Sequence, residues 1–171
     1  DILSRRPTQA ELDAVSLSGR DLSGVVLREL SLSGRDLRGV SFVDAVLNGV
    51  NFDKADLEGA DFSGSEIDGS RFVGAKMRRV CLERARGEDV DFTGADLAEG
   101  RLRGVDLVHA DFTNACLNGA DFRKARLFGP VLDGAELAEI QAEDAHLRNM
   151  PANSPEALLF LTAGARIGGT F

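Results

Sequence analysis

The residues of this chain that could do chemistry are few, and their spacing matches no common active site. The two histidines, His109 and His146, and the two cysteines, Cys81 and Cys116, lie far apart in the sequence. The cysteines fit neither a metal-binding spacing nor a disulfide framework, and neither histidine has a nucleophile at a fixed spacing. A glycine-rich phosphate-binding motif is also missing. The sequence therefore predicts no enzyme, no cofactor and no metal site.

The elements that position these residues follow one register of five. From Leu12 to Leu147, every fifth residue is large and apolar except Gly87 and Ala142. We call this position the centre of a unit. The residue two places earlier is mostly Ala or Val, the residue between them is mostly polar, and two residues rich in Gly, Ser, Asn and charge follow. Neither a helix nor a simple strand has this period.

Each unit is predicted to be a short extended segment with small-in, polar-out, large-in alternation, followed by a corner. A single unit cannot bury its apolar face alone, so successive turns of a coil must stack. The units ADLEG, ADFSG and ADFTN, at residues 55–59, 60–64 and 110–114, resemble the pentapeptide repeat family, and the resemblance covers about residues 10–149. The resemblance implies an all-β, right-handed quadrilateral β-helix with four units per coil. It also implies that the aspartate before each centre points outward, where its carboxylate can accept backbone N–H groups.

Four units per coil predict that centres twenty residues apart stack on one wall. The four walls then begin at Leu12, Leu17, Leu22 and Leu27. All phenylalanines at centres fall on the first and third walls, which are opposite: Phe52, Phe72, Phe92 and Phe112 on the first, and Phe42, Phe62 and Phe122 on the third. This sorting supports the period of twenty. It gives about seven coils and a rod of roughly 34 Å, whose interior is filled by side chains and has no ligand cavity.

The chain is expected to have three parts: an N-terminal cap at residues 1–11, the solenoid at residues 12–149 and a helical cap or tail at residues 150–171. Thr8 is a candidate helix N-cap with Glu11 three residues later. The repeat stops after Leu147, and Ser154 and Pro155 begin a short helix.

This C-terminal helix is apolar almost all round, because it contains Leu158, Leu159, Phe160 and Leu161. One face is expected to cover the last coil. The other face is either part of a plain cap or the contact with a second copy, since some members of the pentapeptide repeat family dimerise through such segments.

Three residues break the repeat. Gly87 leaves the fourth wall without a large side chain between Ile67 and Leu107. This gap is either a tolerated defect or the site of a local bend or bulge. Arg20 and Arg35 stand where Ala is expected. Because a buried unpaired guanidinium is costly, we expect both to turn outward or to reach the open N-terminal end.

Function is expected on the outer walls. The first wall is the most acidic, with Glu11, Asp13, Asp53, Asp91, Asp111 and Asp133 against Lys54 and Arg71. The fourth wall has four outward apolar residues: Val26, Val46, Val108 and Phe128. Phe128 is expected to lie near the C-terminal helix and to pack under it. The two histidines are outward on the fourth wall, and the two cysteines are outward on different walls. The candidate partner surface consists of Val26, Val46, Asp53, Asp91, Asp111 and Asp133.

Three functions remain open at this point. The first is a non-enzymatic protein-binding or scaffold module, because the resemblance implies a rigid rod with flat walls and some such proteins are linked to bacterial secretion as effectors or adaptors. The second is an acidic DNA mimic that binds DNA gyrase, as in relatives that protect gyrase from quinolones; the interspersed basic residues and the absence of room for a projecting loop count against it. The third is an inert spacer.

Composition limits the partners and the compartment. The net charge of −8 argues against nucleic acid and anionic membrane as ligands and is compatible with a basic partner. The unpaired cysteine pattern suits a reducing compartment, so we expect a cytoplasmic protein, with a secreted effector as the alternative. No signal peptide or apolar run of transmembrane length is visible. Because the chain starts at Asp1, we expect a processed form or a domain of a longer protein.

Overall fold

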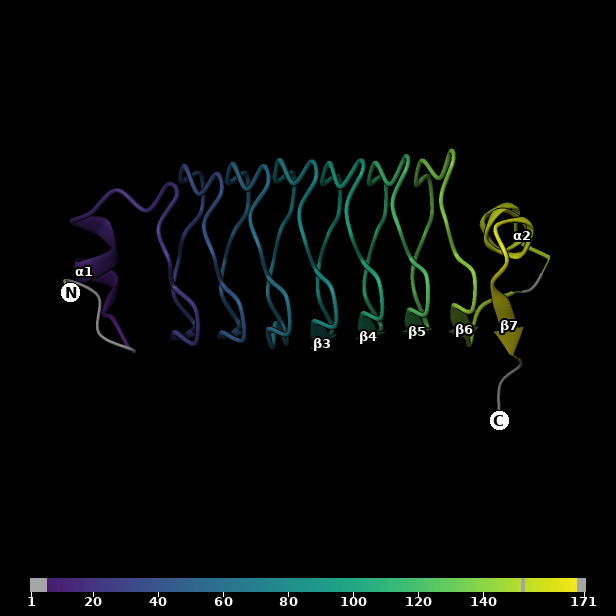
Figure 1. Ribbon diagram of the computed structural model, residues 1–171, viewed down its shortest axis with the longest axis horizontal. Helices are drawn as coiled ribbons and strands as arrows, with labels where there is room; N and C mark the ends of the chain where they lie inside the picture. The colour runs from purple at the N-terminus through teal and green to yellow at the C-terminus, as the bar shows by residue number, and fades with distance from the viewer. Residues whose placement is uncertain (1–5, 152, 169–171) are drawn as a thin grey trace.

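The computed structural model describes residues 6–151 and 153–168, which form an elongated parallel β-solenoid of about seven turns with a helix near each end (Figure 1). α1 and α2 lie at opposite ends of the rod. The elements are α1 (Gln9–Asp13), β1 (Val26–Arg28), β2 (Val46–Asn48), β3 (Arg86–Glu88), β4 (Asp106–Val108), β5 (Arg126–Phe128), β6 (His146–Arg148), α2 (Pro155–Thr162) and β7 (Arg166–Gly168). The predicted all-β solenoid with a short C-terminal helix is confirmed.

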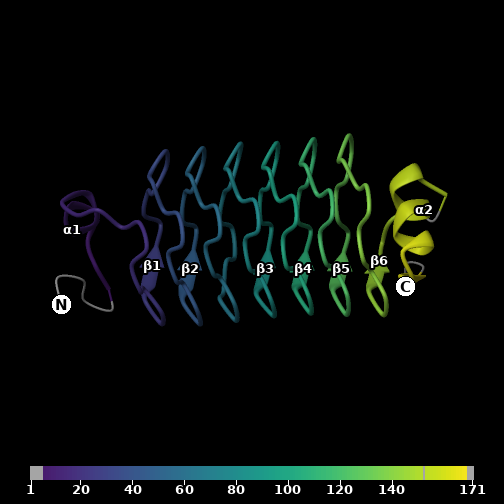
Figure 2. The same ribbon diagram turned by 45° about the horizontal axis from the view of Figure 1, so that its top comes forward.

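All the labelled strands lie on the fourth wall, in one row along the rod (Figure 2). β1 pairs in parallel with β2, and β3 to β7 form a second parallel sheet. Partners are twenty residues apart, as in Val26 with Val46. The other walls are connected by single parallel bridges with the same offset, such as that between Asp36 and Asp56. The coil of four units is therefore confirmed.

The corners of the coil depend on the second residue after each centre. From Gly19 to Asn149 this residue always has a positive φ, whether it is glycine or a residue such as Lys54, with φ 58°. The left-handed conformation costs glycine nothing, which explains the glycines of the repeat. A hydrogen bond then closes the corner, as from the N–H of Ala55 to the carbonyl of Phe52 at 3.0 Å.

The interior of the square is filled by the phenylalanines of opposite walls. Phe52, Phe72 and Phe92 stack along the first wall with ring centroids 4.9 and 5.0 Å apart. Phe62, on the third wall, meets the rings of Phe52 and Phe72 edge to face at 5.7 Å. The aromatic columns therefore touch across the rod, and the phenylalanines are fully buried. Dispersion and area burial along these columns stabilise the coil boundaries between Phe42 and Phe122.

Gly87 is a tolerated gap and not a bulge. It lies inside β3, in register with Leu107 of β4. A Cβ at this position would be 2.5 Å from Cγ2 of Val90 and 2.9 Å from Cγ1 of Ile67. These two neighbouring side chains occupy the space that a larger residue would need, so the wall continues without a bend.

The N-terminal end is closed by α1 in the way the sequence predicts. Thr8 and Glu11 form a capping box, and Leu12 is buried. Arg35 reaches this end, where its Nη2 donates to the carbonyls of Leu12 and Val15 at 3.0 and 2.7 Å. The guanidinium thereby satisfies carbonyls at the end of α1. Arg20 is exposed and donates to the carbonyl of Ser16 at 2.6 Å.

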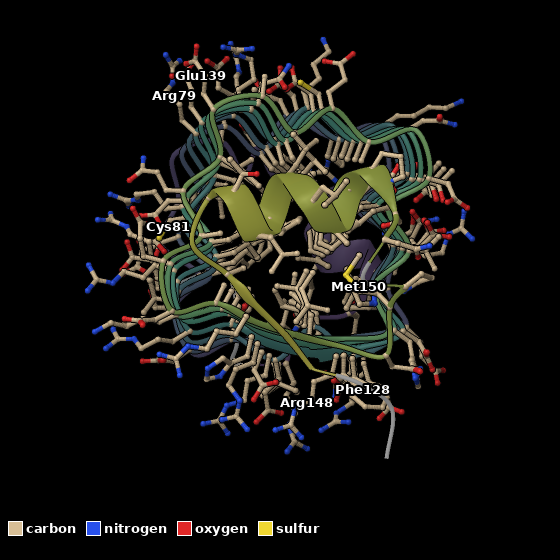
Figure 3. The ribbon with its side chains drawn as sticks, turned by 90° about the vertical axis from the view of Figure 1, so that its right-hand side faces the viewer. Arg79, Cys81, Phe128, Glu139, Arg148 and Met150 are labelled. Carbon is tan, nitrogen blue, oxygen red and sulfur yellow. The ribbon has the colours of Figure 1, made fainter. Side chains whose placement is uncertain are left out.

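The C-terminal end is closed by α2, which crosses the mouth of the square (Figure 3). Ser154 is its N-cap and accepts from the N–H of Ala157 at 3.1 Å, with Pro155 in the first turn. Phe160 is fully buried and lies 5.2 Å from the ring of Phe122. The face of α2 that contains Phe160 therefore caps the last coil, as expected.

The repeat does not stop at Leu147, which corrects one sequence-based prediction. After α2 the chain returns to the fourth wall as β7, where Ile167 pairs with Leu147 at the usual offset of twenty. Ala165 is buried in the position that a small residue occupies in each unit. The loop and α2 thus replace three sides of an eighth coil, and residues 165–168 supply the fourth side.

Candidate partner surfaces

The histidines and cysteines do not converge. Cys81 and Cys116 are free, and the described residues contain no group of three or more His, Cys, Asp or Glu that could hold a metal. Nδ1 of His109 lies 3.7 Å from Oδ1 of Asp89, and both side chains are exposed. Burial raises the pKa of the Cys116 thiol, which makes it a poor nucleophile at neutral pH.

Cys81 is less accessible than the sequence predicts. It stands at an outward position but is only 3 % exposed, because neighbouring coils cover it (Figure 3). Its Sγ lies 3.0 Å from Oγ of Ser63 on the preceding coil. On the following coil, Arg101 pairs with Cys81 through a parallel β-bridge. Cys81 therefore belongs to the packed outer layer of the wall.

Most carboxylates before the centres serve the corners. The Oδ1 atoms of Asp91 and Asp111 accept the N–H groups of Thr93 and Thr113 at 2.9 and 2.8 Å. The same geometry recurs at Asp21, Asp36, Asp56, Asp61, Asp96 and Asp121. These aspartates form the turns that the repeat needs. At Asp36 and Asp121 the second oxygen is also bound, since it accepts from Nη2 of Arg38 and of Arg123 at 2.6 Å.

The acidic first wall is only partly free. Arg71 pairs with Asp53 at 2.9 Å and approaches Asp91 at 4.0 Å. Asp53 also accepts the N–H of Val73 at 3.0 Å. Asp53 is therefore tied into the wall, whereas Asp111 stacks directly on Asp91 and Asp133 is exposed.

The valine pair of the fourth wall is half-buried. Val26 and Val46 face each other across β1 and β2, and Val46 is bridged to Glu66 on the next coil. The structure brings the two valines together as expected, but their exposed area is smaller than a fully outward position implies. They form a small, nearly flat apolar site.

Larger apolar side chains are exposed at the C-terminal end. Leu158, Leu159 and Leu161 of α2 are 54 %, 46 % and 41 % exposed. These leucines point away from the coil that Phe160 covers.

Phe128 corrects another prediction. It does not pack under α2 but points outward from the fourth wall, 43 % exposed, with Arg148 beside it (Figure 3). The two residues line an open groove of about 740 Å³ over β4, β5 and β6. The sequence reasoning missed this groove, although the outward positions of the fourth wall after Val108 contain the signal: arginine replaces the acids of the preceding coils.

A comparison with known families agrees with this architecture. The family described as "Pentapeptide repeat region" matches residues 36–122, which is half of the chain, and that described as "Pentapeptide repeats (8 copies)" matches residues 8–49. The chain belongs to the pentapeptide repeat family. None of the curated proteins matches its sequence.

Solved pentapeptide repeat structures are similar at low identity. A trypsin-treated variant of QnrB1, a plasmid-mediated fluoroquinolone resistance protein, is 19 % identical, with 89 % of this chain and 85 % of that chain covered and a TM-score of 0.47. HetL, involved in heterocyst differentiation regulation in the cyanobacterium Nostoc sp. strain PCC 7120, is 24 % identical, with coverage of 81 % and 78 % and a TM-score of 0.36. Rfr23 from the cyanobacterium Cyanothece 51142 is 20 % identical, with coverage of 75 % and 88 % and a TM-score of 0.27. None of these similarities transfers a partner or an activity to this chain.

The helices add one further observation. Within residues 6–151 and 153–168, neither α1 nor α2 combines the length and the apolar character that crossing a bilayer requires.

Proposed function

We propose that this pentapeptide repeat chain is a non-enzymatic interaction or scaffold module, a rigid rod whose outer walls bind protein partners. One observation supports this most directly: the rings of Phe52, Phe62 and Phe72 touch across the interior at 5.7 Å, so no space for a substrate exists between them. Binding must then use the outer surface. A role as a domain of a larger bacterial effector or adaptor fits this module, and its free cysteines fit a reducing compartment such as the cytoplasm.

The candidate contact sites are the half-buried pair Val26 and Val46 and the carboxylates of the first wall. Asp91, Asp111 and Asp133 are the stronger acidic candidates, since Asp53 is already bound to Arg71. For the exposed leucines of α2 we propose a second copy of this chain as the occupant, because three leucines grouped on one short helix form an apolar surface at the free end of the rod.

Affinity capture from a lysate of the source cell tests the module. The intact chain is compared with Val26→Asp/Val46→Asp and with Asp91→Asn/Asp111→Asn, and Glu66→Gln serves as a control in the same outward row as the valines. Circular dichroism verifies that each variant is folded. We expect one specific protein to be captured and one variant to lose it; no specific capture by the folded intact chain would favour an inert spacer.

A DNA mimic that binds gyrase is the second candidate. It is favoured by the net charge of −8 and by the direct stacking of Asp91 on Asp111 along the first wall. A supercoiling assay with purified gyrase tests it. If the mimic is real, the intact chain inhibits supercoiling and the Asp91→Asn/Asp111→Asn/Asp133→Asn variant does not. Equal inhibition by both proteins, or none by the intact chain, would rule it out.

A further inference from the structure

The C-terminal end of the fourth wall has a charge opposite to that of the whole molecule. The wall is mainly acidic in its middle coils, with Glu66, Asp68, Glu88 and Asp89 against Arg86. On β5, β6 and β7 the outward side chains are Arg126, Phe128, His146, Arg148 and Arg166. This part of the wall is therefore cationic and contains an exposed aromatic ring.

Two rows of side chains run along the rod here. Strand pairing places Val108, Phe128 and Arg148 in one row. The parallel row begins at Asp106 on β4 and continues through Arg126 and His146 to Arg166. The open groove of about 740 Å³ lies over these strands, with Leu127 at its base. Lys124 also lines the groove, as do Asp106 and Asp144, so an apolar strip and a mainly cationic strip border the same hollow.

The cationic charge is only loosely neutralised. Arg126 is 3.7 Å from Asp106 and Arg166 is 4.0 Å from Asp144, and both arginines are more than two-thirds exposed. Within the described residues, Arg148 makes no ion pair within 4.0 Å. Its guanidinium is therefore available to a carboxylate from another molecule.

We propose that this groove binds an acidic segment of a partner protein, with one apolar side chain of the segment against Phe128 and its carboxylates on Arg148 and Arg126. Aromatic residues and arginine dominate the energetic centres of protein interfaces, and opposite charge speeds and orients the encounter. Rungs about 4.8 Å apart over β4 to β7 give roughly 14 Å, enough for about four residues of an extended chain. The inference rests on the proposed interaction module and names its partner chemistry.

The global charge does not oppose this site. At physiological salt the screening length is about 8 Å, so the acids of the second wall, which lies opposite across the rod, contribute little here. A long polyanion is a poorer occupant than a short segment. Beyond β4 it would run onto Glu88 and Asp89, and it would gain nothing from the apolar strip of Val108 and Phe128.

Fluorescence anisotropy with the intact folded chain tests the proposal. The probe is a fluorescein-labelled heptapeptide with one central phenylalanine and three glutamates on each side. Two comparison peptides replace either the phenylalanine by glycine or the glutamates by lysines. We expect the acidic phenylalanine peptide to bind at least about tenfold more tightly than either comparison peptide, and binding to weaken as salt rises.

Variants place the binding in the groove. Arg148→Glu and Phe128→Ser are each expected to weaken the probe by about tenfold or more. Arg28→Glu is the matched control, since Arg28 is exposed at the same position of the same wall near the other end of the rod, and it should bind the probe like the intact chain.

Several outcomes would contradict the proposal that the groove binds an acidic segment. One is that Arg148→Glu and Phe128→Ser bind the probe as tightly as the intact chain. Another is that the intact chain binds a labelled single-stranded RNA of seven nucleotides more tightly than it binds the probe. Absence of probe binding would also reject it. Lysate capture separates this failure from a failure of the interaction module. If Arg148→Glu and Phe128→Ser still capture a partner that Val26→Asp/Val46→Asp no longer captures, the interaction module stands and only the proposed groove site is rejected.

Discussion

Asp121 shows at the scale of single residues how the outer carboxylates serve the fold. Its Oδ1 accepts from Nε and the backbone N–H of Arg123 at 2.8 and 3.0 Å, and its Oδ2 is 2.6 Å from Nη2 of the same arginine. The side-chain hydrogen bond with Arg123 is the main cause that holds the pKa of the Asp121 carboxyl below its usual value, against the opposing effect of burial. A lowered folded-state pKa contributes stability above the unfolded-state pKa of about 3.9 and loses it as the pH falls through the folded-state value.

Asp121→Asn is therefore expected to destabilise the protein at pH values above the unfolded-state pKa of about 3.9. The amide keeps an acceptor for the N–H of Arg123 but loses the charge, so the free energy of unfolding should fall by up to about 1 kcal/mol at pH 7. The difference from the intact chain should shrink as the pH falls below about 3.9 and through the folded-state pKa. Urea denaturation at pH 7, 5 and 2.5 measures it, with the exposed Asp144→Asn as control. A difference that is constant with pH would show that charge is not the cause.

Gly87 gives a second prediction at this scale. Its added Cβ would collide with Val90 and Ile67, so Gly87→Ala should lower the free energy of unfolding by about 1–3 kcal/mol. Truncating the neighbour should relieve the collision. In the Gly87→Ala/Val90→Ala variant we expect a smaller loss than the sum of the two single losses, by at least about 0.5 kcal/mol. Urea denaturation of the four proteins gives this coupling, and strict additivity would mean that the space at Gly87 is not closed.

At the scale of elements, α2 has one face on the solenoid and one that is exposed. Phe160 belongs to the first face, and Leu158, Leu159 and Leu161 belong to the second. We expect Leu158→Ser/Leu159→Ser/Leu161→Ser to abolish the proposed dimer with little change in the stability of the monomer, because none of the three leucines belongs to the hydrophobic core. Sedimentation velocity at micromolar concentration measures the association. An intact chain that is monomeric there would contradict the dimer, and Glu156→Gln on the same helix is the control.

The sequence could predict the elements that follow the repeat, and it missed those that depend on neighbours in space. The register of five, the columns of phenylalanine and the caps at Thr8 and Ser154 depend on local spacing, so they could be inferred. β7 was missed because a loop and a helix fill three sides of its coil before the register resumes at Ile167. The burial of Cys81 was missed because Ser63 and Arg101 cover it from other coils.

The candidate sites were less predictable than the fold, for the same reason. The repeat shows which side chains point outward, and the pairing of Val26 with Val46 follows from the offset of twenty. It does not show that Arg71 removes Asp53 from the free acidic surface, since that depends on how a long side chain lies across a coil boundary. The outward position of Phe128 depends on where α2 crosses the mouth of the square, which no residue spacing specifies.

At the scale of the whole molecule, the rod behaves as a one-dimensional stack in which each coil contacts only its neighbours. Removing a whole coil should therefore keep every wall in register. Deletion of residues 70–89, which is four units, places Phe92 directly above Phe52 and brings the small residue Val90 to the position of Ser70. The phenylalanine column of the first wall then remains continuous, the third wall keeps large apolar residues in register, and Gly87 is removed with the deleted coil.

Deletions of three or five units remove a similar length of chain but turn the remaining coils by one wall. Deleting residues 70–84 puts Gly87 above Phe52, and deleting residues 70–94 puts Leu97 there and moves Phe112 above Ile67. Each junction then has large side chains opposite small ones, with a cavity or an overpacked contact. We expect both variants to be less stable than the four-unit deletion by about 3 kcal/mol or more in urea denaturation. The three-unit deletion is shorter than one coil, and the five-unit deletion is longer. If the free energy of unfolding simply falls as more residues are deleted, with the four-unit deletion between the other two, the columns do not determine the stacking.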